Sequence, residues 1–260
     1  MKPALIVLFW FAGGAAQAQV MLESKTAGVI DDLVSANRIL AGQGVLDGFG
    51  HVSARSPADP SHFYMARSVA PSTVTSTDIM EFDRDGKPIG LESRLPYAER
   101  FIHSEIYKAR PDVMAVVHGH TASVIPYGVT NVALRPVYHM SGFLGKGAPV
   151  FDIRDAVKPG IETDLLVKTA GLGSKLADKL GRSSVVLMRG HGFAAVGPSI
   201  PVVVFRSVYT DQNARIESEA LKLGTPRFLT EREAALTQET MEPLSLRSWE
   251  MWKKQPGLLQ

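Results

Sequence analysis

The sequence predicts a single α/β domain in which helices cover a mixed β-sheet. Short apolar stretches of strand length alternate along the chain with longer segments whose apolar residues recur at helical spacing. No internal repeat, low-complexity tract or clear linker divides the 260 residues. Hydrophobic residues make up 45% of the chain and charged residues 21%, so one sizeable core can form. Alternation of strands and helices is typical of an α/β fold.

The strand predictions depend on alternation, on short apolar runs and on turn residues. Residues 49–55 (FGHVSAR) alternate in polarity, and Asp85-Gly86 marks a hairpin turn inside residues 80–89. The runs at 113–117 and 185–188 are apolar throughout, as in buried strands, and 193–196 is interpreted as a continuation of the second run. The predicted strand segments are 49–55, 62–66, 80–89, 113–117, 185–188 and 193–196.

The helix predictions depend on helical spacing and on residues that begin or end helices. Gly42 and Gly44 end the first segment, and Pro96 begins the second. Gly171 and Gly173 weaken the third prediction, because glycine is a poor helix former. The predicted helices are 22–40, 96–110, 163–180, 201–223 and a last segment from 231 towards 252.

Residues 1–18 resemble a secretory signal peptide. Lys2 precedes an apolar run from Ala4 to Ala12, and the small residues Ala16 and Ala18 follow at the spacing of a cleavage site. The alternative interpretation is a buried N-terminal strand or helix. Cleavage after Ala18 would leave residues 19–260 as one catalytic domain with a C-terminal helical tail. We then expect a periplasmic or secreted protein, and otherwise a cytoplasmic one.

Composition and charge exclude several classes of function. The net charge is +2, so there is no basic surface of the kind that nucleic acid requires. No later segment is long and apolar enough to cross a bilayer, so we expect no stable membrane anchor. The chain has no cysteine, which excludes thiol nucleophiles, disulfides and Cys-ligated metals. Any metal ion must therefore be bound by His, Asp or Glu.

Three histidines lie at the ends of predicted buried strands. His118 and His120 are two residues apart on an extended segment, so both side chains project to the same face. His191 follows another buried strand and lies between two glycines, where the backbone can turn sharply. Three His ligands with open positions are typical of a catalytic metal site. The alternative is a chance arrangement of packed or surface histidines, because the His-x-His pattern is short.

Glu99 is the candidate general acid or base. It lies near the start of the predicted helix 96–110, and His103 shares its helix face at spacing i, i+4. A helix–loop–strand connection can bring this turn beside the end of strand 113–117. On position alone, the structural interpretation is the stronger one, since a carboxylate at a helix start is stabilised by the helix dipole.

Taken together, these residues resemble the class II aldolase/adducin family from about residue 30 to residue 223. The resemblance is carried by Gly50-His51-Val52-Ser53, Pro96-Tyr97-Ala98-Glu99, His118-Gly119-His120 and His191-Gly192. It implies a three-layer α/β/α sandwich with a mixed central sheet, often a homotetramer with active sites at subunit interfaces. It also implies a small-molecule substrate and one divalent metal ion per subunit, bound by His118, His120 and His191. Glu99 would be the acid/base and would contact the metal when substrate is absent.

One departure from the family pattern bears on the substrate. Its sugar-phosphate aldolases have Asn where this chain has His51, and the loop at 66–71 lacks a glycine that would let backbone N–H groups approach a phosphate. The stretches GHVSAR, LPYAERFIHSEIYKARPDVMAVVHGH and VVLMRGHG look like a narrower branch. That branch contains decarboxylases of hydroxylated aromatic dicarboxylates, such as hydroxymethylpyridine-dicarboxylate and dihydroxyphthalate.

The resulting hypothesis is a divalent-metal-dependent lyase that decarboxylates a hydroxylated aromatic acid. Candidate substrate-binding residues are His51, Ser53, Arg67, His103 and Tyr209. Arg67 is equally well explained as a surface strand residue and His51 as a core or capping residue, and Tyr209 is better explained as a core aromatic. Zinc, manganese and cobalt all suit imidazole ligands. The alternatives are an aldolase or epimerase acting on a non-phosphorylated hydroxy-carbonyl compound, and a non-catalytic interaction module of the adducin type.

Overall fold

In a computed structural model, which describes residues 10–90 and 93–255, the chain forms one seven-stranded sheet. The strand order is β3-β2-β1-β4-β7-β6-β5, and every neighbouring pair is antiparallel except β5 and β6. The sheet is therefore mixed, as predicted. The strands are β1 (His51–Arg55), β2 (Phe63–Ala66), β3 (Ile79–Phe82), β4 (Ala115–Gly119), β5 (Val150–Phe151), β6 (Val185–Met188) and β7 (Gly192–Gly197).

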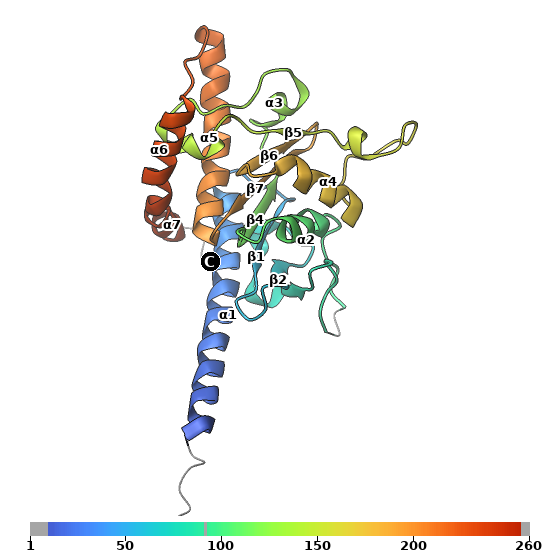
Figure 1. Ribbon diagram of the computed structural model, residues 1–260, viewed down its shortest axis with the longest axis vertical. Coiled ribbons are helices and arrows are strands. Elements are labelled where there is room, and N and C mark those ends of the chain that lie inside the picture. The colour runs from blue at the N-terminus through green and yellow to red at the C-terminus, as the bar shows by residue number, and fades with distance from the viewer. Residues whose placement is uncertain (1–9, 91–92, 256–260) are drawn as a thin grey trace, which may run out of the picture.

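Helices cover both faces of this sheet (Figure 1). One hydrophobic core lies between the sheet and α1, α5 and α7, and a second lies between the sheet and α2 and α4. In β4, Val117 points to the first core and Val116 to the second, because successive strand residues face opposite sides. The predicted three-layer α/β/α sandwich is confirmed. The α-helices are α1 (Trp10–Gly42), α2 (Arg100–Ala109), α3 (Ile125–Val129), α4 (Ala170–Leu180), α5 (Ile200–Leu223), α6 (Glu231–Met241) and α7 (Ser245–Lys253).

Several predicted boundaries are wrong for local reasons. Helix α4 begins at Ala170 rather than at 163, because the Thr169 side chain caps it by accepting from the Leu172 amide. Helix α2 begins at Arg100, so Glu99 is the N-cap residue and lies just before the first turn. Segment 193–196 does not continue β6. It belongs to β7, which returns antiparallel after a turn in which Gly190 has a φ of +64°.

Three further segments differ from the sequence prediction. The hairpin expected at 80–89 is reduced to β3 and a single bridge between Phe82 and Pro88. The final segment is divided into α6 and α7, with Pro243 in the short 3₁₀ turn that separates them. Strand β5 was not predicted, because two residues carry no periodic signal.

Helix α1 is longer at its amino end than the predicted helix 22–40. It begins at Trp10, runs through Ala18 without interruption, and extends away from the rest of the domain (Figure 1). Residues 1–9 lie outside the described part of the chain, so the signal peptide and its cleavage stay predictions. Within the described residues, none of the helices has the length and apolar character needed to cross a bilayer.

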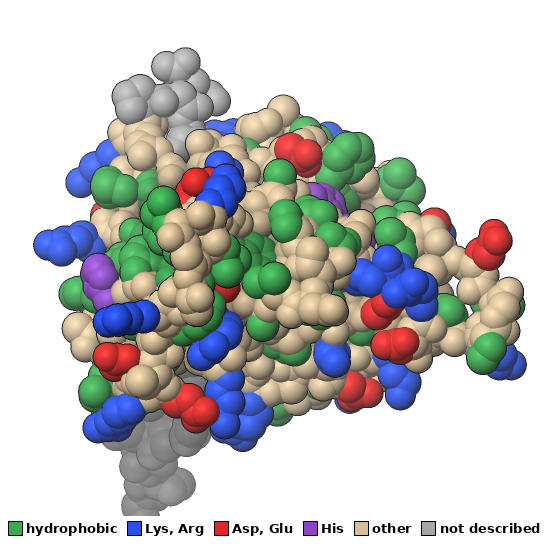
Figure 2. Space-filling model, turned by 90° about the horizontal axis from the view of Figure 1, so that it is seen from above, with side chains coloured by type: hydrophobic (Ala, Val, Ile, Leu, Met, Phe, Trp, Pro, Cys, Tyr) green, Lys and Arg blue, Asp and Glu red, His purple; other side chains and the backbone are tan. Residues whose placement is uncertain are grey.

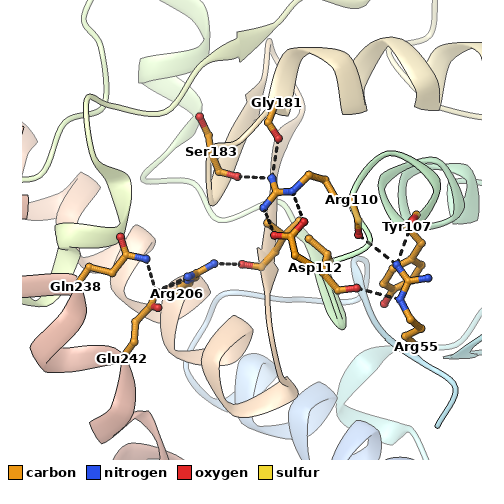
Figure 3. Close-up of polar contacts among 11 residues, drawn as sticks. Arg55, Tyr107, Arg110, Asp112, Gly181, Ser183, Arg206, Gln238 and Glu242 are labelled. Carbon is orange, nitrogen blue, oxygen red and sulfur yellow. Dashed lines mark hydrogen bonds and ion pairs between the residues drawn. The ribbon is translucent and has the colours of Figure 1, made fainter. Parts of the chain in front are cut away.

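Arginine clusters hold together the end of the sheet at which β4 begins (Figure 3). Arg110 makes a two-pronged contact with Asp112, and this contact lowers the pKa of Asp112 to about 2. Arg206, which is almost fully buried in α5, donates to the Val196 carbonyl and pairs with Glu242 after α6. These contacts attach the C-terminal helices to the sheet.

Figure 2 shows the molecule from above the view of Figure 1. On the surface seen there, basic and acidic side chains are interspersed.

Candidate metal centre and active site

Four side chains from separate parts of the sequence converge at the other end of β4. The residues are Glu99, His118, His120 and His191, and each offers a ligand atom within 4.8 Å of all the others. The Nε2 atom of His120 lies 3.0 Å from that of His118 and 3.1 Å from that of His191. The Oε2 atom of Glu99 lies 3.5 Å from His118 Nε2 and 3.4 Å from His191 Nε2. The predicted ligand set and the predicted acid/base therefore occupy one place.

The sheet produces this convergence. His118 lies in β4 and His120 just beyond its end, while His191 lies in the turn between β6 and β7. Strand β7 pairs with β4, which brings that turn against the His-Gly-His segment. Close approach there requires glycine, because a Cβ atom on Gly192 would lie only 2.2 Å from the Gly119 carbonyl oxygen.

Backbone groups orient the imidazoles and the carboxylate. His118 Nδ1 donates to the Phe193 carbonyl oxygen at 2.9 Å, and His191 Nδ1 donates to the Leu165 carbonyl oxygen at 2.9 Å. A ring that donates from Nδ1 and binds a metal ion has its lone pair on Nε2, the atom that faces the other ligands in both residues. Glu99 Oε1 accepts from the Val167 amide at 2.8 Å, which leaves Oε2 towards the histidines.

Leu165 has an unusual backbone conformation that serves this arrangement. Its φ is +68°, and it is the only residue other than glycine with a positive φ among those that the structure describes. This conformation is costly for a branched side chain. It places the Leu165 carbonyl on His191 and, two residues later, the Val167 amide on Glu99.

The electrostatics of the four residues favour a bound cation. Burial and, after it, the neighbouring imidazoles of His118 and His191 lower the pKa of His120 to about 4, so His120 is neutral. Burial opposes a charge on Glu99, but the close contacts of its carboxylate with the His118 and His191 imidazoles outweigh this effect and lower its pKa. Burial likewise opposes a charge on His191, but contact with Glu99 raises its pKa. A carboxylate beside converging lone pairs attracts positive charge to this point.

The donor set fits a divalent metal ion. Without a cation, the lone pairs of His118 and His191 and the Glu99 carboxylate would be brought together in a largely buried place at an electrostatic cost. Nitrogen atoms bound to one ion at about 2.1 Å lie roughly 3 Å apart, close to the spacing seen here. Three imidazoles and one carboxylate suit a borderline or hard divalent ion.

Three predicted substrate-binding residues form a buried chain beside the four ligands. His51 Nδ1 lies 2.6 Å from His103 Nε2, and His103 Nδ1 lies 2.6 Å from the Ser53 hydroxyl oxygen. Ser53 and His103 are fully buried, and His51 is 2% exposed. Burial and neighbouring imidazoles lower the pKa values of both histidines, that of His103 to about 3. The ring centroid of His51 lies 5.2 Å from that of His118.

The other two predicted substrate-binding residues have structural partners. Arg67 Nε contacts Asp78 Oδ1 at 2.6 Å, and the Arg67 backbone pairs with Pro96 near the start of α2. Tyr209 packs against Phe205 and Trp252 in the helical layer of α5 and α7. Neither residue belongs to the group of converging ligands. A role for Tyr209 in a neighbouring subunit stays a prediction.

Sequence reasoning missed several residues that support the site. Tyr107 completes the buried chain, with its hydroxyl 2.8 Å from that of Ser53. Its spacing could have revealed it, because residues 99, 103 and 107 share one helix face. The ring centroid of Tyr97 lies 4.5 Å from that of His51. The backbone roles of Leu165 and Val167 carry no signal in the sequence.

Fold and site together define an α/β enzyme domain with a candidate divalent-metal centre at the ends of its strands. The chain belongs to the family described as Class II Aldolase and Adducin N-terminal domain, whose sequence model matches residues 31–218. The family resemblance inferred from the motifs is thereby confirmed.

Relatives with assigned names point to breakage of carbon–carbon bonds. The chain is 41% identical over 243 residues to decarboxylase tropJ of Talaromyces stipitatus, covering 85% of this chain and 91% of the relative. It is 28% identical to 3,4-dihydroxyphthalate decarboxylase of Terrabacter sp., covering 74% and 81%. Decarboxylases and aldolases are both carbon–carbon lyases, and the chain is an enzyme of this class.

The solved structures agree on the fold. L-fuculose 1-phosphate aldolase from Glaciozyma antarctica PI12 aligns with a TM-score of 0.74 and 22% identity, covering 97% of this chain and 92% of that one. At this identity the likeness shows a common fold and leaves the substrate open.

Proposed function

We propose that the chain is a divalent-metal-dependent decarboxylase of a hydroxylated aromatic carboxylic acid. The observation that carries the proposal is the convergence of Glu99 with His118, His120 and His191. Its chemical direction is supported by the relatives named decarboxylases, one of which acts on a dihydroxyphthalate. Zinc, manganese and cobalt all fit the ligand set, one ion per subunit. The protein would act as a homo-oligomer, a tetramer by analogy with the family.

A bound divalent ion would act as a Lewis acid that stabilises negative charge developing on a substrate oxygen. Glu99 faces the same point through Oε2, while its Oε1 is held by the Val167 amide. As an ionised carboxylate, it accepts the proton of the substrate's ring hydroxyl. When the carbon–carbon bond breaks and carbon dioxide leaves, the electron pair remains on the ring carbon. Glu99 returns the proton to that carbon.

The aldolase alternative has weaker support. The aldolases that align with this chain are under 25% identical and share the fold, whereas the more similar relatives by sequence are named decarboxylases. The loop that follows β2 also lacks glycine for phosphate binding, as described above. An interaction module without catalysis would have no need of four converging ligands.

A substrate panel tests the proposal. Protein loaded with zinc, manganese or cobalt is incubated with 2,3-dihydroxybenzoate, 3,4-dihydroxyphthalate and a set of non-phosphorylated hydroxy-carbonyl compounds. We expect carbon dioxide from at least one aromatic acid and no aldehyde from any compound. The Glu99→Gln protein, loaded with the same metal, is the matched control for background loss of carbon dioxide. Release of an aldehyde without carbon dioxide would overturn the proposal in favour of an aldolase.

A further inference from the structure

A row of four polar side chains connects the interior of the α2 layer to the metal centre. Tyr107 and His103 lie on α2, and Ser53 and His51 lie on the face of β1 that is turned towards α2. Consecutive members are 2.8, 2.6 and 2.6 Å apart from Tyr107 to His51. All four are buried, so water does not supply alternative partners along the row.

We propose that this row acts as a one-directional chain of hydrogen bonds that holds His51 with its hydrogen on Nε2, where it donates to a carboxylate oxygen of the substrate. Tyr107, Ser53 and His103 are then positioning residues, and His51 is the group that contacts substrate. The acceptor's identity rests on the proposed function, whereas the direction of the hydrogen bonds rests on the contacts and burial of these four residues.

The direction follows from the Tyr107 end. Among the described residues, the Ser53 oxygen is the one acceptor within hydrogen-bond distance of the Tyr107 hydroxyl. The other close polar group is the Arg55 guanidinium, 4.7 Å from the ring centroid, and it has donors but no acceptor. Figure 3 shows Arg55 beside Tyr107, where it also donates to the Tyr107 carbonyl. Burial raises the pKa of Tyr107, so its hydroxyl keeps its hydrogen.

Each later bond is then determined by the one before it. Ser53 accepts from Tyr107, so its own hydrogen is donated to His103 Nδ1. A neutral His103 with an accepting Nδ1 carries its hydrogen on Nε2, which donates to His51 Nδ1. His51 in turn carries its hydrogen on Nε2. The reverse order would leave the Tyr107 hydrogen buried without an acceptor, which disfavours it about tenfold or more.

The position of His51 makes this direction useful. Its backbone pairs with that of His118 across β1 and β4, and its ring lies between those of Tyr97, His103 and His118. Gly50 has a φ of +90°, and a Cβ atom there would lie 2.9 Å from the His118 carbonyl oxygen, so the strand begins tightly against β4. A donor fixed beside the ligands is complementary to a carboxylate, which only accepts.

The first experiment measures the hydrogen position directly. Long-range proton–nitrogen correlation spectra of zinc-loaded, ¹⁵N-histidine-labelled protein report which ring nitrogen carries hydrogen, and the His51 signals are assigned by their loss in His51→Gln. We expect the Nε2–H form in the wild type and a mixture of both forms in Tyr107→Phe. Tyr127→Phe is the matched control, because it removes another tyrosine hydroxyl whose partners, Ala214 and Ser218, lie on α5 and outside the row of hydrogen bonds. A wild-type His51 with its hydrogen on Nδ1 would overturn the inference, whatever the enzyme's substrate.

The second experiment measures the consequence for binding. Salicylate carries a carboxylate next to its hydroxyl, whereas catechol has no carboxylate. We expect Tyr107→Phe to weaken salicylate binding roughly threefold to tenfold, with catechol binding and metal content unchanged. Equal weakening of both ligands would show a general structural role and contradict the donor role. If neither ligand binds the wild type, the proposed function is at fault, and the spectra still decide the direction of the chain.

Discussion

The two ends of β4 carry polar clusters of opposite character. Where the strand begins, the charges of Asp112 and Arg206 are each matched by a partner within the protein (Figure 3). Where it ends, the lone pairs of His118 and His191 and the Glu99 carboxylate face one another. A cluster whose charges are matched by partners contributes to stability, whereas one that gathers several lone pairs and a carboxylate at one point is arranged for a ligand. The predictions below test this contrast, starting from the largest expected effect.

Removal of a ligand should abolish the metal centre. We expect His118→Ala to lose stoichiometric metal and all turnover above background, because His118 supplies a fully buried ring nitrogen to the group. Elemental analysis of the purified protein measures the first effect. His62→Ala is a suitable control, since His62 contacts Asp59 and Glu81 at a distance from the ligands. Full metal content in His118→Ala would refute the ligand set.

Glu99→Gln should separate metal binding from chemistry. The amide retains the size of the side chain but cannot carry the proton, so we expect the three histidines to keep the metal while kcat falls about 10²- to 10⁴-fold. Metal content and steady-state rates on the same sample provide the test. Undiminished product formation would remove Glu99 from the mechanism.

At the opposite end of β4, a substitution should affect stability and leave the chemistry intact. Glu242→Ala leaves the buried Arg206 guanidinium without its carboxylate, and we expect the free energy of unfolding to fall by about 3 kcal/mol. Urea denaturation measures the loss. Glu231→Ala removes an exposed pair with Lys146 and should cost less than about 1 kcal/mol. Loss of metal by folded Glu242→Ala protein would show that the two ends are not independent.

The smallest expected effect concerns Glu217, a buried carboxyl on α5. Burial raises its pKa to about 7, and its Oε1 atom has no hydrogen-bond partner among the described residues. A raised pKa means that the folded state holds the proton more tightly than the unfolded state does. The resulting contribution of Glu217 to the free energy of unfolding is complete below about pH 4.5 and is lost as the pH rises through 7.

Glu217→Gln should therefore match the wild type near pH 4.5 and be more stable by about 1–3 kcal/mol at pH 8. Denaturant titrations across this range test the difference. Glu219→Gln, an exposed neighbour paired with Lys222, should show no such trend. A Glu217→Gln protein less stable than the wild type at pH 8 would contradict the argument.

The three histidines of the candidate metal centre could be predicted from sequence because they lie at or near strand ends. His118 and His120 share a face by strand geometry alone, and the glycines on either side of His191 indicate a turn. Their approach to one another depends on the pairing of β4 with β7, which is not a local property. For the same reason the strand order could not be predicted. The left-handed conformation of Leu165 was also hidden, since leucine rarely adopts it.

The substrate-binding residues stay predictions, and the structure shows how differently they are placed. His51, Ser53 and His103 lie together, and the polar atoms of Ser53 and His103 are paired with Tyr107, with His51 and with one another. Sequence shows which residues share a helix face or strand face, and it does not show how deep that face lies. Tyr209 illustrates the same point, because its place against Trp252 is set by helix α7, far along the chain.

The anchoring of His118 and His191 to main-chain carbonyl oxygens has an evolutionary consequence. Every residue type supplies the same carbonyl, so the orientation of the imidazoles depends on the course of the backbone at 165 and 193 and not on a polar side chain there. Side chains that surround the histidines can therefore change during evolution while the imidazoles keep their orientation. A lineage built in this way can acquire new substrates by gradual replacement of neighbours while the histidines stay in place.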